Sequence, residues 1–132
     1  DSNFDGNNFS GSLKIPKGLT SISTSAFAYC TFTGEVEIPD GVTYIHKLAF
    51  RGSKNLQKVI LPSNLEFIDE NAFSYCISLR VIECKSPVPP VVNSTAFNGV
   101  PLEDLTVIVP KSALNDYKSS DFWSGLLLKT VE

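Results

Sequence analysis

Apolar residues recur along the chain with a period of 23, and three units follow one another without a gap over residues 13–35, 36–58 and 59–81. Each unit opens with an apolar–variable–apolar triplet, which predicts a short strand with side chains alternating between two faces. A proline ends this strand because it cannot donate to a hydrogen-bonded ladder. The residues after the proline, such as Lys17-Gly18, are typical of tight turns.

A second short strand is expected next, over residues 19–22 and their equivalents, followed by an Ala-Phe pair. We expect the stretch around this pair to form one helical or 3₁₀ turn, with the phenylalanine pointing inward. The columns that agree in kind across the three units are Leu13/Val36/Val59, Ile15/Ile38/Leu61, Pro16/Pro39/Pro62, Leu19/Val42/Leu65, Ile22/Ile45/Ile68, Ala26/Ala49/Ala72 and Phe27/Phe50/Phe73.

The same register extends beyond these three units in both directions. Residues 1–12 read as the second half of a unit whose first half is missing, and residues 82–106 read as a fourth unit with a proline-rich insertion. Residues 107–132 supply a last strand and a C-terminal cap, so residues 1–132 form a single domain in this interpretation. We expect either that residues 1–12 cap the N-terminal end imperfectly or that more repeats or another domain precede it. End-to-end contact between copies at this end is a further expectation.

One such unit cannot bury its own apolar face, so the units must stack. Stacking would align equivalent strands in parallel ladders about 4.8 Å apart, giving about five units a length of roughly 25 Å. The predicted fold is therefore a β-rich solenoid with short helical or 3₁₀ turns.

The segments IPKGLTSISTSAFAYC, IPDGVTYIHKLAFRGS and LPSNLEFIDENAFSYC resemble the BspA-type (Treponema pallidum-type) leucine-rich repeat, whose unit runs as IxLP, LxxI and AFxxC. Ser53 departs from the pattern, since it replaces the cysteine of the middle unit. The tail resembles the closing segment of such arrays in Bacteroides-type surface proteins. The resemblance implies a bacterial cell-surface or secreted location and a role in adhesion to matrix proteins, other cells or glycans. It implies a right-handed, β-rich solenoid of the leucine-rich-repeat kind, and it implies no catalytic residues.

Composition narrows the possible functions further. The chain has 132 residues with 11 Lys and Arg against 14 Asp and Glu, a net charge of −3, and no basic run that would suggest nucleic acid or an anionic membrane. No apolar stretch is long enough to span a bilayer. The chain begins at Asp1 and contains no methionine, which we interpret as a mature or trimmed product.

The three cysteines are expected to be reduced and to face the core. Cys30 and Cys76 share a column two units apart, roughly 10 Å, which exceeds the limit of about 7 Å between Cα atoms for a disulfide. Cys84 falls in a strand column otherwise filled by isoleucine and leucine. A Cys76–Cys84 bridge and a zinc site remain as alternatives, although no CxxC or histidine cluster exists.

No catalytic or cofactor-binding motif stands out. His46 is the only histidine, and its column otherwise holds Ser23 and Asp69, so we expect it to face solvent. Carboxylates such as Glu35 and Asp69 are scattered, whereas a glycoside hydrolase needs a pair at a defined separation in a cleft. We expect no cofactor, no metal and no enzymatic activity.

The variable strand positions are the candidate binding residues, since they should face outward. One stripe runs through Lys14, Glu37 and Ile60, and another brings Tyr44 beside Phe67. Stacked repeats use such stripes as extended binding surfaces. The alternative is that Tyr44 and Phe67 pack beneath a loop or a further domain.

The tail is expected to close the array. Ser112 can cap a short helix, Asp121 can begin another turn, and residues 126–128 can form a last strand. Trp123 then covers the terminal core, with a ligand-stacking role as the alternative.

These observations predict a monomeric, non-catalytic surface module that binds a protein or glycan on host or neighbouring cells. It would bind no nucleic acid and would not insert into a membrane. The alternatives are a structural spacer within a larger surface protein and, less in keeping with the residue pattern, a hydrolase.

Overall fold

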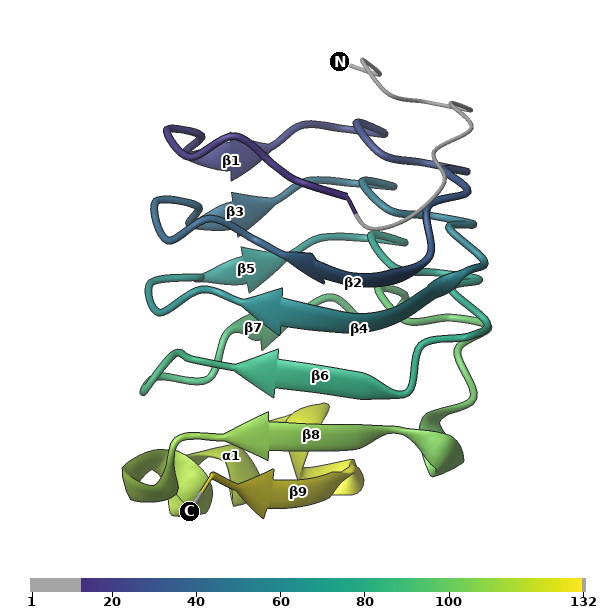
Figure 1. Ribbon diagram of the computed structural model, residues 1–132. Coiled ribbons are helices and arrows are strands. Elements are labelled where there is room, and N and C mark those ends of the chain that lie inside the picture. The colour runs from purple at the N-terminus through teal and green to yellow at the C-terminus, as the bar shows by residue number, and fades with distance from the viewer. Residues whose placement is uncertain (1–12, 132) are drawn as a thin grey trace.

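The computed structural model describes residues 13–131, whose backbone winds into stacked coils bordered by two parallel sheets (Figure 1). The larger sheet has the strand order β2-β4-β6-β8-β9 and the smaller has the order β1-β3-β5-β7. The larger contains β2 (Gly34–Glu37), β4 (Leu56–Leu61), β6 (Val81–Cys84), β8 (Thr106–Val109) and β9 (Leu127–Thr130). The smaller contains β1 (Ser21–Ile22), β3 (Tyr44–Ile45), β5 (Phe67–Ile68) and β7 (Val91–Val92).

The strand registers reproduce the period of the sequence. In the larger sheet Val36 pairs with Val59, which pairs with Ile82, and Leu13 forms an isolated parallel bridge with Val36. In the smaller sheet Ile22, Ile45 and Ile68 are aligned in the same way. The predicted β-rich solenoid of leucine-rich-repeat type is therefore confirmed.

The core between the two sheets contains a stack of phenylalanine rings. The rings of Phe27, Phe50, Phe73, Phe97 and Phe122 follow one another with centroids 5.2, 5.1, 5.2 and 5.0 Å apart. The first four come from the Ala-Phe pairs of successive coils, so one column of the repeat forms a continuous apolar spine. The centroid spacing matches the strand spacing, because both are set by the distance between coils.

The segment around each Ala-Phe pair is not the helical or 3₁₀ turn that the sequence predicted. It is a series of tight turns containing residues with positive φ, such as Ser25 (59°) and Tyr29 (60°) in the first described coil. Amide groups there alternate between two acceptors. Ala26 N donates to Ser23 O within the coil, whereas Phe27 N donates to Ala49 O of the next coil. Besides the two sheets, a third column of backbone hydrogen bonds therefore links successive coils. A helical turn would have used these amides within its own coil.

The cysteine column contributes hydrogen bonds to the same region. Cys76 Sγ donates to Phe50 O at 3.2 Å, and Ser53 Oγ donates to Phe27 O at 2.9 Å. Ser53 is fully buried and makes the same type of bond as the cysteine it replaces. Cys76 and Cys84 are free, buried thiols, and Cys30 is also buried.

The C-terminal segment closes the stack largely as expected. Trp123 is fully buried, its Nε1 donates to Pro90 O at 2.9 Å, and its ring packs edge-on against Tyr117. This segment contains the 3₁₀ helices η1 (Leu102–Asp104), η2 (Lys111–Ala113) and η3 (Trp123–Gly125) and the helix α1 (Leu114–Lys118).

One detail of the tail was predicted wrongly. No side chain caps α1, whose N-cap residue is Ala113, so Ser112 does not have the capping role. The predicted last strand is confirmed as β9, which extends the larger sheet over Leu127–Thr130, and Phe122 extends the phenylalanine stack. Among the described residues, no helix has the length and apolar character needed to cross a bilayer.

Candidate binding faces

The outward face of the smaller sheet carries an aromatic pair. Tyr44 and Phe67 are register partners in β3 and β5, and their ring centroids are 5.2 Å apart. Both side chains are partly exposed, and Val91, the next residue in this row, is 63% exposed. The predicted neighbourhood of Tyr44 and Phe67 is confirmed, and they lie on a surface that also presents an aliphatic side chain.

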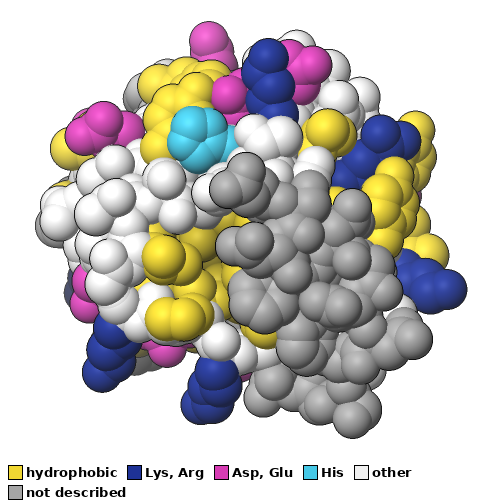
Figure 2. Space-filling model, turned by 90° about the horizontal axis from the view of Figure 1, so that it is seen from above, with side chains coloured by type: hydrophobic (Ala, Val, Ile, Leu, Met, Phe, Trp, Pro, Cys, Tyr) yellow, Lys and Arg dark blue, Asp and Glu magenta, His cyan; other side chains and the backbone are white. Residues whose placement is uncertain are grey.

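Polar groups lie beside this pair in the adjacent column. Tyr44 Oη donates to Asp69 Oδ2 at 2.8 Å, and the His46 ring lies 4.3 Å from the Tyr44 ring, centroid to centroid. The hydrogen bond to Asp69 raises the pKa of Tyr44, so the phenol stays protonated. Figure 2, where the histidine is cyan, shows hydrophobic side chains beside it. We call Tyr44, His46, Phe67, Asp69 and Val91 the aromatic face.

The stripe predicted on the larger sheet has a different character. Glu37 forms an ion pair with Lys85 at 2.9 Å, although β4 lies between the strands that position them. Glu83, which is in register with Ile60, pairs with Lys58 at 3.4 Å. These long side chains occupy the outer surface of the sheet. The hydrogen bond to Glu37 raises the pKa of Lys85, which keeps the ammonium charged.

The expectation that Ile60 is exposed was wrong. Its side chain is only 9% exposed, although its position alternates with the inward-facing Val59. Its register neighbours are Glu37 on β2 and Glu83 on β6, and both are engaged in ion pairs with lysines. The methylene groups of such long side chains can cover an apolar neighbour while their charges remain in water. Ile60 therefore belongs to the packing of the sheet surface.

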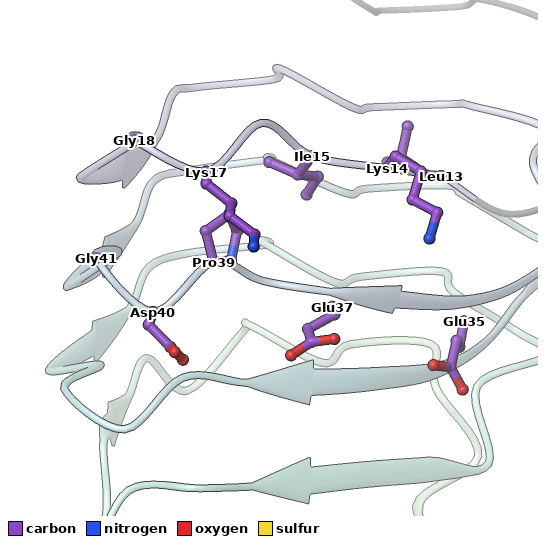
Figure 3. Close-up of a pocket in the computed structure, with 10 residues that line it drawn as sticks. All are labelled: Leu13, Lys14, Ile15, Lys17, Gly18, Glu35, Glu37, Pro39, Asp40 and Gly41. Carbon is purple, nitrogen blue, oxygen red and sulfur yellow. The ribbon is translucent and has the colours of Figure 1, made fainter.

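Lys14 is exposed at the N-terminal end of the same wall. It borders a hollow of about 560 Å³ whose lining includes Lys17, Glu35, Glu37 and Asp40 (Figure 3). Charges of both signs line this hollow, and Lys85 bridges Glu37 and Asp40. The structure therefore separates the five predicted site residues into two sets on different sheets. Lys14, Glu37 and Ile60 lie with the larger sheet, and Tyr44 and Phe67 lie on the smaller.

The buried thiols do not present a reactive site. Burial raises the pKa of both Cys76 and Cys84 to about 12, so both are protonated at neutral pH. A protonated, buried thiol is a poor nucleophile and a poor metal ligand. Within residues 13–131, no group of three His, Cys, Asp or Glu side chains could hold a metal ion.

A further surface was missed by the sequence reasoning. Tyr29 and Tyr75 occupy the same column of the tight turns, and their side chains are 52% and 51% exposed. Gly52 and Gly99 fill this column in the alternate coils, and the signal was present in the sequence as an alternation of tyrosine and glycine. We call the surface formed by Tyr29, Arg51, Gly52, Tyr75 and Gly99 the turn ridge.

These features define a parallel-stacked repeat protein of the leucine-rich-repeat class, with its candidate residues on outward faces. The family model for the BspA type leucine rich repeat region matches residues 1–123 in six copies, and the chain belongs to this family. Proteins of this family are typically non-catalytic repeat modules.

The chain is also similar to a solved structure, a leucine rich cell surface protein from Faecalibacterium prausnitzii A2-165. The two share 27% sequence identity with a TM-score of 0.62. The match covers 97% of this chain but only 33% of the other, so the chain spans about a third of that protein's length. No curated protein matches the chain significantly.

Proposed function

We propose that this chain is a non-catalytic module of a bacterial cell-surface or secreted protein, and that it binds a protein or glycan on a host or neighbouring cell through the aromatic face. Family membership and the similarity to a cell surface protein support the location. The observation that carries the binding role is the partly exposed pair of Tyr44 and Phe67 on an outward ladder.

The chemistry of the aromatic face suits recognition. Tyrosine and other large aromatics are enriched among the residues that dominate binding energy. Tyr44 is held by its hydrogen bond to Asp69 and by contact with Phe67, so little conformational freedom would be lost on binding. The outer face of the larger sheet has its charges largely neutralised in pairs, and exposed ion pairs of this kind contribute little energy.

The test is a screen of the purified chain against arrays of matrix proteins and glycans, with the Tyr44→Ala/Phe67→Ala variant in parallel. We expect a saturable interaction that the double substitution weakens by at least about tenfold, which corresponds to roughly 1.4 kcal/mol. Glu37→Ala/Lys85→Ala is the matched control, because it removes an interacting pair from the other wall. It should leave the interaction unchanged.

Two results would contradict the proposal. Loss of binding in the control but not in the aromatic variant would place the binding surface on the larger sheet. A folded chain that binds nothing on either array would favour a structural spacer that separates other domains from the cell surface.

A further inference from the structure

The turn ridge presents two tyrosines in equivalent positions. In each case one edge of the ring rests against the glycine of the following coil. A Cβ atom on Gly52 would lie 2.5 Å from Tyr29 Cδ1, and one on Gly99 would lie 2.5 Å from Tyr75 Cδ1. Both rings therefore lean in the same direction along the stack. A side chain at Gly52 or Gly99 would therefore displace the tyrosine ring of the preceding coil.

The backbone at these positions makes the choice of tyrosine unusual. Tyr29 and Tyr75 have φ angles of 60° and 61°, in the left-handed region that favours glycine, and Gly52 and Gly99 adopt similar values of 72° and 81°. A bulky residue there costs about 1–2 kcal/mol relative to glycine. Packing against the glycine accounts for only part of the choice, since about half of each tyrosine remains exposed to solvent. Strained positions that keep an unfavourable residue are often functional.

The alternation also fixes the distance between the rings. Tyr29 N donates to Arg51 O at 2.7 Å, and Gly52 N donates to Ser74 O at 2.8 Å, so this part of the turn is tied from coil to coil. Because two coil spacings separate the tyrosines, equivalent ring atoms lie roughly 10 Å apart. This distance is comparable to the disaccharide repeat of an extended, β-linked glycan, in which alternate sugars present the same face to one side.

A cation with unused hydrogen-bond donors lies beside the second ring. The Arg51 guanidinium carbon is 5.3 Å from the Tyr75 ring centroid. Within the described residues its Nε is buried without a hydrogen-bond partner, and no carboxylate is paired with the guanidinium. The guanidinium is therefore held by the ring, and its outer N–H groups can donate to hydroxyl oxygens of a ligand.

We propose that the turn ridge binds a linear, β-linked polysaccharide. Tyr29 and Tyr75 would stack on alternate sugar rings, and Arg51 would donate hydrogen bonds to the hydroxyl groups between them. This surface is separate from the aromatic face, so the inference does not depend on the function proposed above. The spacing favours a periodic ligand over a protein surface, because two equivalent rings that lie two coils apart match the disaccharide repeat of such a ligand.

The experiment measures binding of the full chain to cellohexaose, xylohexaose and chitohexaose by isothermal titration calorimetry. The test variant is Tyr29→Gly/Tyr75→Gly, because glycine already occupies this column at Gly52 and Gly99 and suits the backbone. The variant Tyr29→Phe/Tyr75→Phe keeps the rings, and Lys58→Ala/Glu83→Ala, which removes an ion pair from the larger sheet, is the control. Maltohexaose serves as a ligand of similar size whose α-linked chain coils.

We expect at least one β-linked hexamer to bind and the glycine variant to lose at least about tenfold in affinity. The phenylalanine variant and the control should retain binding, and maltohexaose should bind more weakly. Absence of binding to all three β-linked hexamers would overturn the proposal, as would unchanged binding by the glycine variant. The array screen described above can also yield a protein ligand. If the glycine variant loses that protein ligand and no oligosaccharide binds, the turn ridge is a protein interface, and the polysaccharide proposal is overturned.

Discussion

Gly52→Ala tests how tightly neighbouring coils are packed at the turn ridge. The new Cβ would lie 2.5 Å from Tyr29 Cδ1 and 2.6 Å from Cε1. Carbon atoms in contact normally stand about 3.5–4 Å apart, so the ring must move. The positive φ of 72° at this position adds strain of about 1–2 kcal/mol for any residue with a side chain. With the loss of the ring's packing, we expect a total destabilisation of about 2–3 kcal/mol.

Gly34→Ala is the matched control. Gly34 also has a positive φ of 91°, but a Cβ there would meet nothing within 4 Å. The control therefore carries backbone strain without a steric clash. In a Tyr29→Ala background, Gly52→Ala should lose only the strain, so the two sites should show a coupling of about 1 kcal/mol.

Thermal unfolding followed by circular dichroism measures these differences. For a chain of this size, 1 kcal/mol shifts the melting temperature by roughly 3–5 °C. Gly52→Ala should lower the Tm by about 10 °C and Gly34→Ala by about 5 °C, on the same scale. Equal losses in the two variants, together with no coupling to Tyr29, would refute the argument that the ring occupies the space beside Gly52.

Three further predictions concern the core. Trp123→Ala should destabilise the chain by about 3–5 kcal/mol, whereas Leu127→Ala, at a side chain 57% exposed, should change stability by about 0.5 kcal/mol or less. Similar Tm values for these two variants would show that Trp123 does not close the core. Cys76→Ser should lower the free energy of unfolding by only about 1 kcal/mol, because Ser53 already makes the same kind of hydrogen bond to the preceding coil. Urea unfolding measures this change, and a loss as large as that of Trp123→Ala would contradict the prediction. Stability should also fall as the pH rises above about 9. The pKa of both Cys76 and Cys84 is about 12 in the folded chain, against 9.0 for an unperturbed thiol. Between these two pH values the thiols of the unfolded chain lose their protons while those of the folded chain keep them. Deprotonation therefore favours the unfolded chain, and the free energy of unfolding falls. Below about pH 9 the folded and unfolded chains hold the same number of thiol protons, so these thiols do not make the stability depend on pH. A urea midpoint that stays constant from pH 7 to pH 10 would contradict it.

The repeat architecture could be predicted from the sequence because its determinants are local. The residues themselves show the period of 23, the equivalent apolar positions Ile22 and Ile45, and the prolines that end the first strand of each unit. Since identical units can bury their apolar faces only by stacking, the register of Tyr44 with Phe67 followed from the period alone. The capping role of Trp123 followed in the same way, because a stack must end with residues that cover its last coil.

Other features depended on contacts between coils that no single unit contains. Ile60 lies in a strand column that alternation assigns to the outside, but its exposure is decided by the long side chains on both neighbouring strands. Phe122 joins the ring stack although the repeat spacing has already broken down, because a flat ring of the right size closes the apolar surface of Phe97. The tight turns hold residues such as Tyr29 at positive φ because amides there donate to the next coil, which secondary-structure propensity cannot anticipate.

The sequence by itself therefore determined the period, the inward columns and the class of fold, since these follow from periodicity and from the chemistry of proline, glycine and apolar side chains. The tertiary structure decided which outward residues are open to a ligand. Glu37 and Lys85 are 48 residues apart in sequence and yet form an ion pair, while Tyr29 rests on Gly52 and stays half exposed. The physical reason is that exposure and pairing depend on neighbours in adjacent coils, and those neighbours are set only when the coils stack.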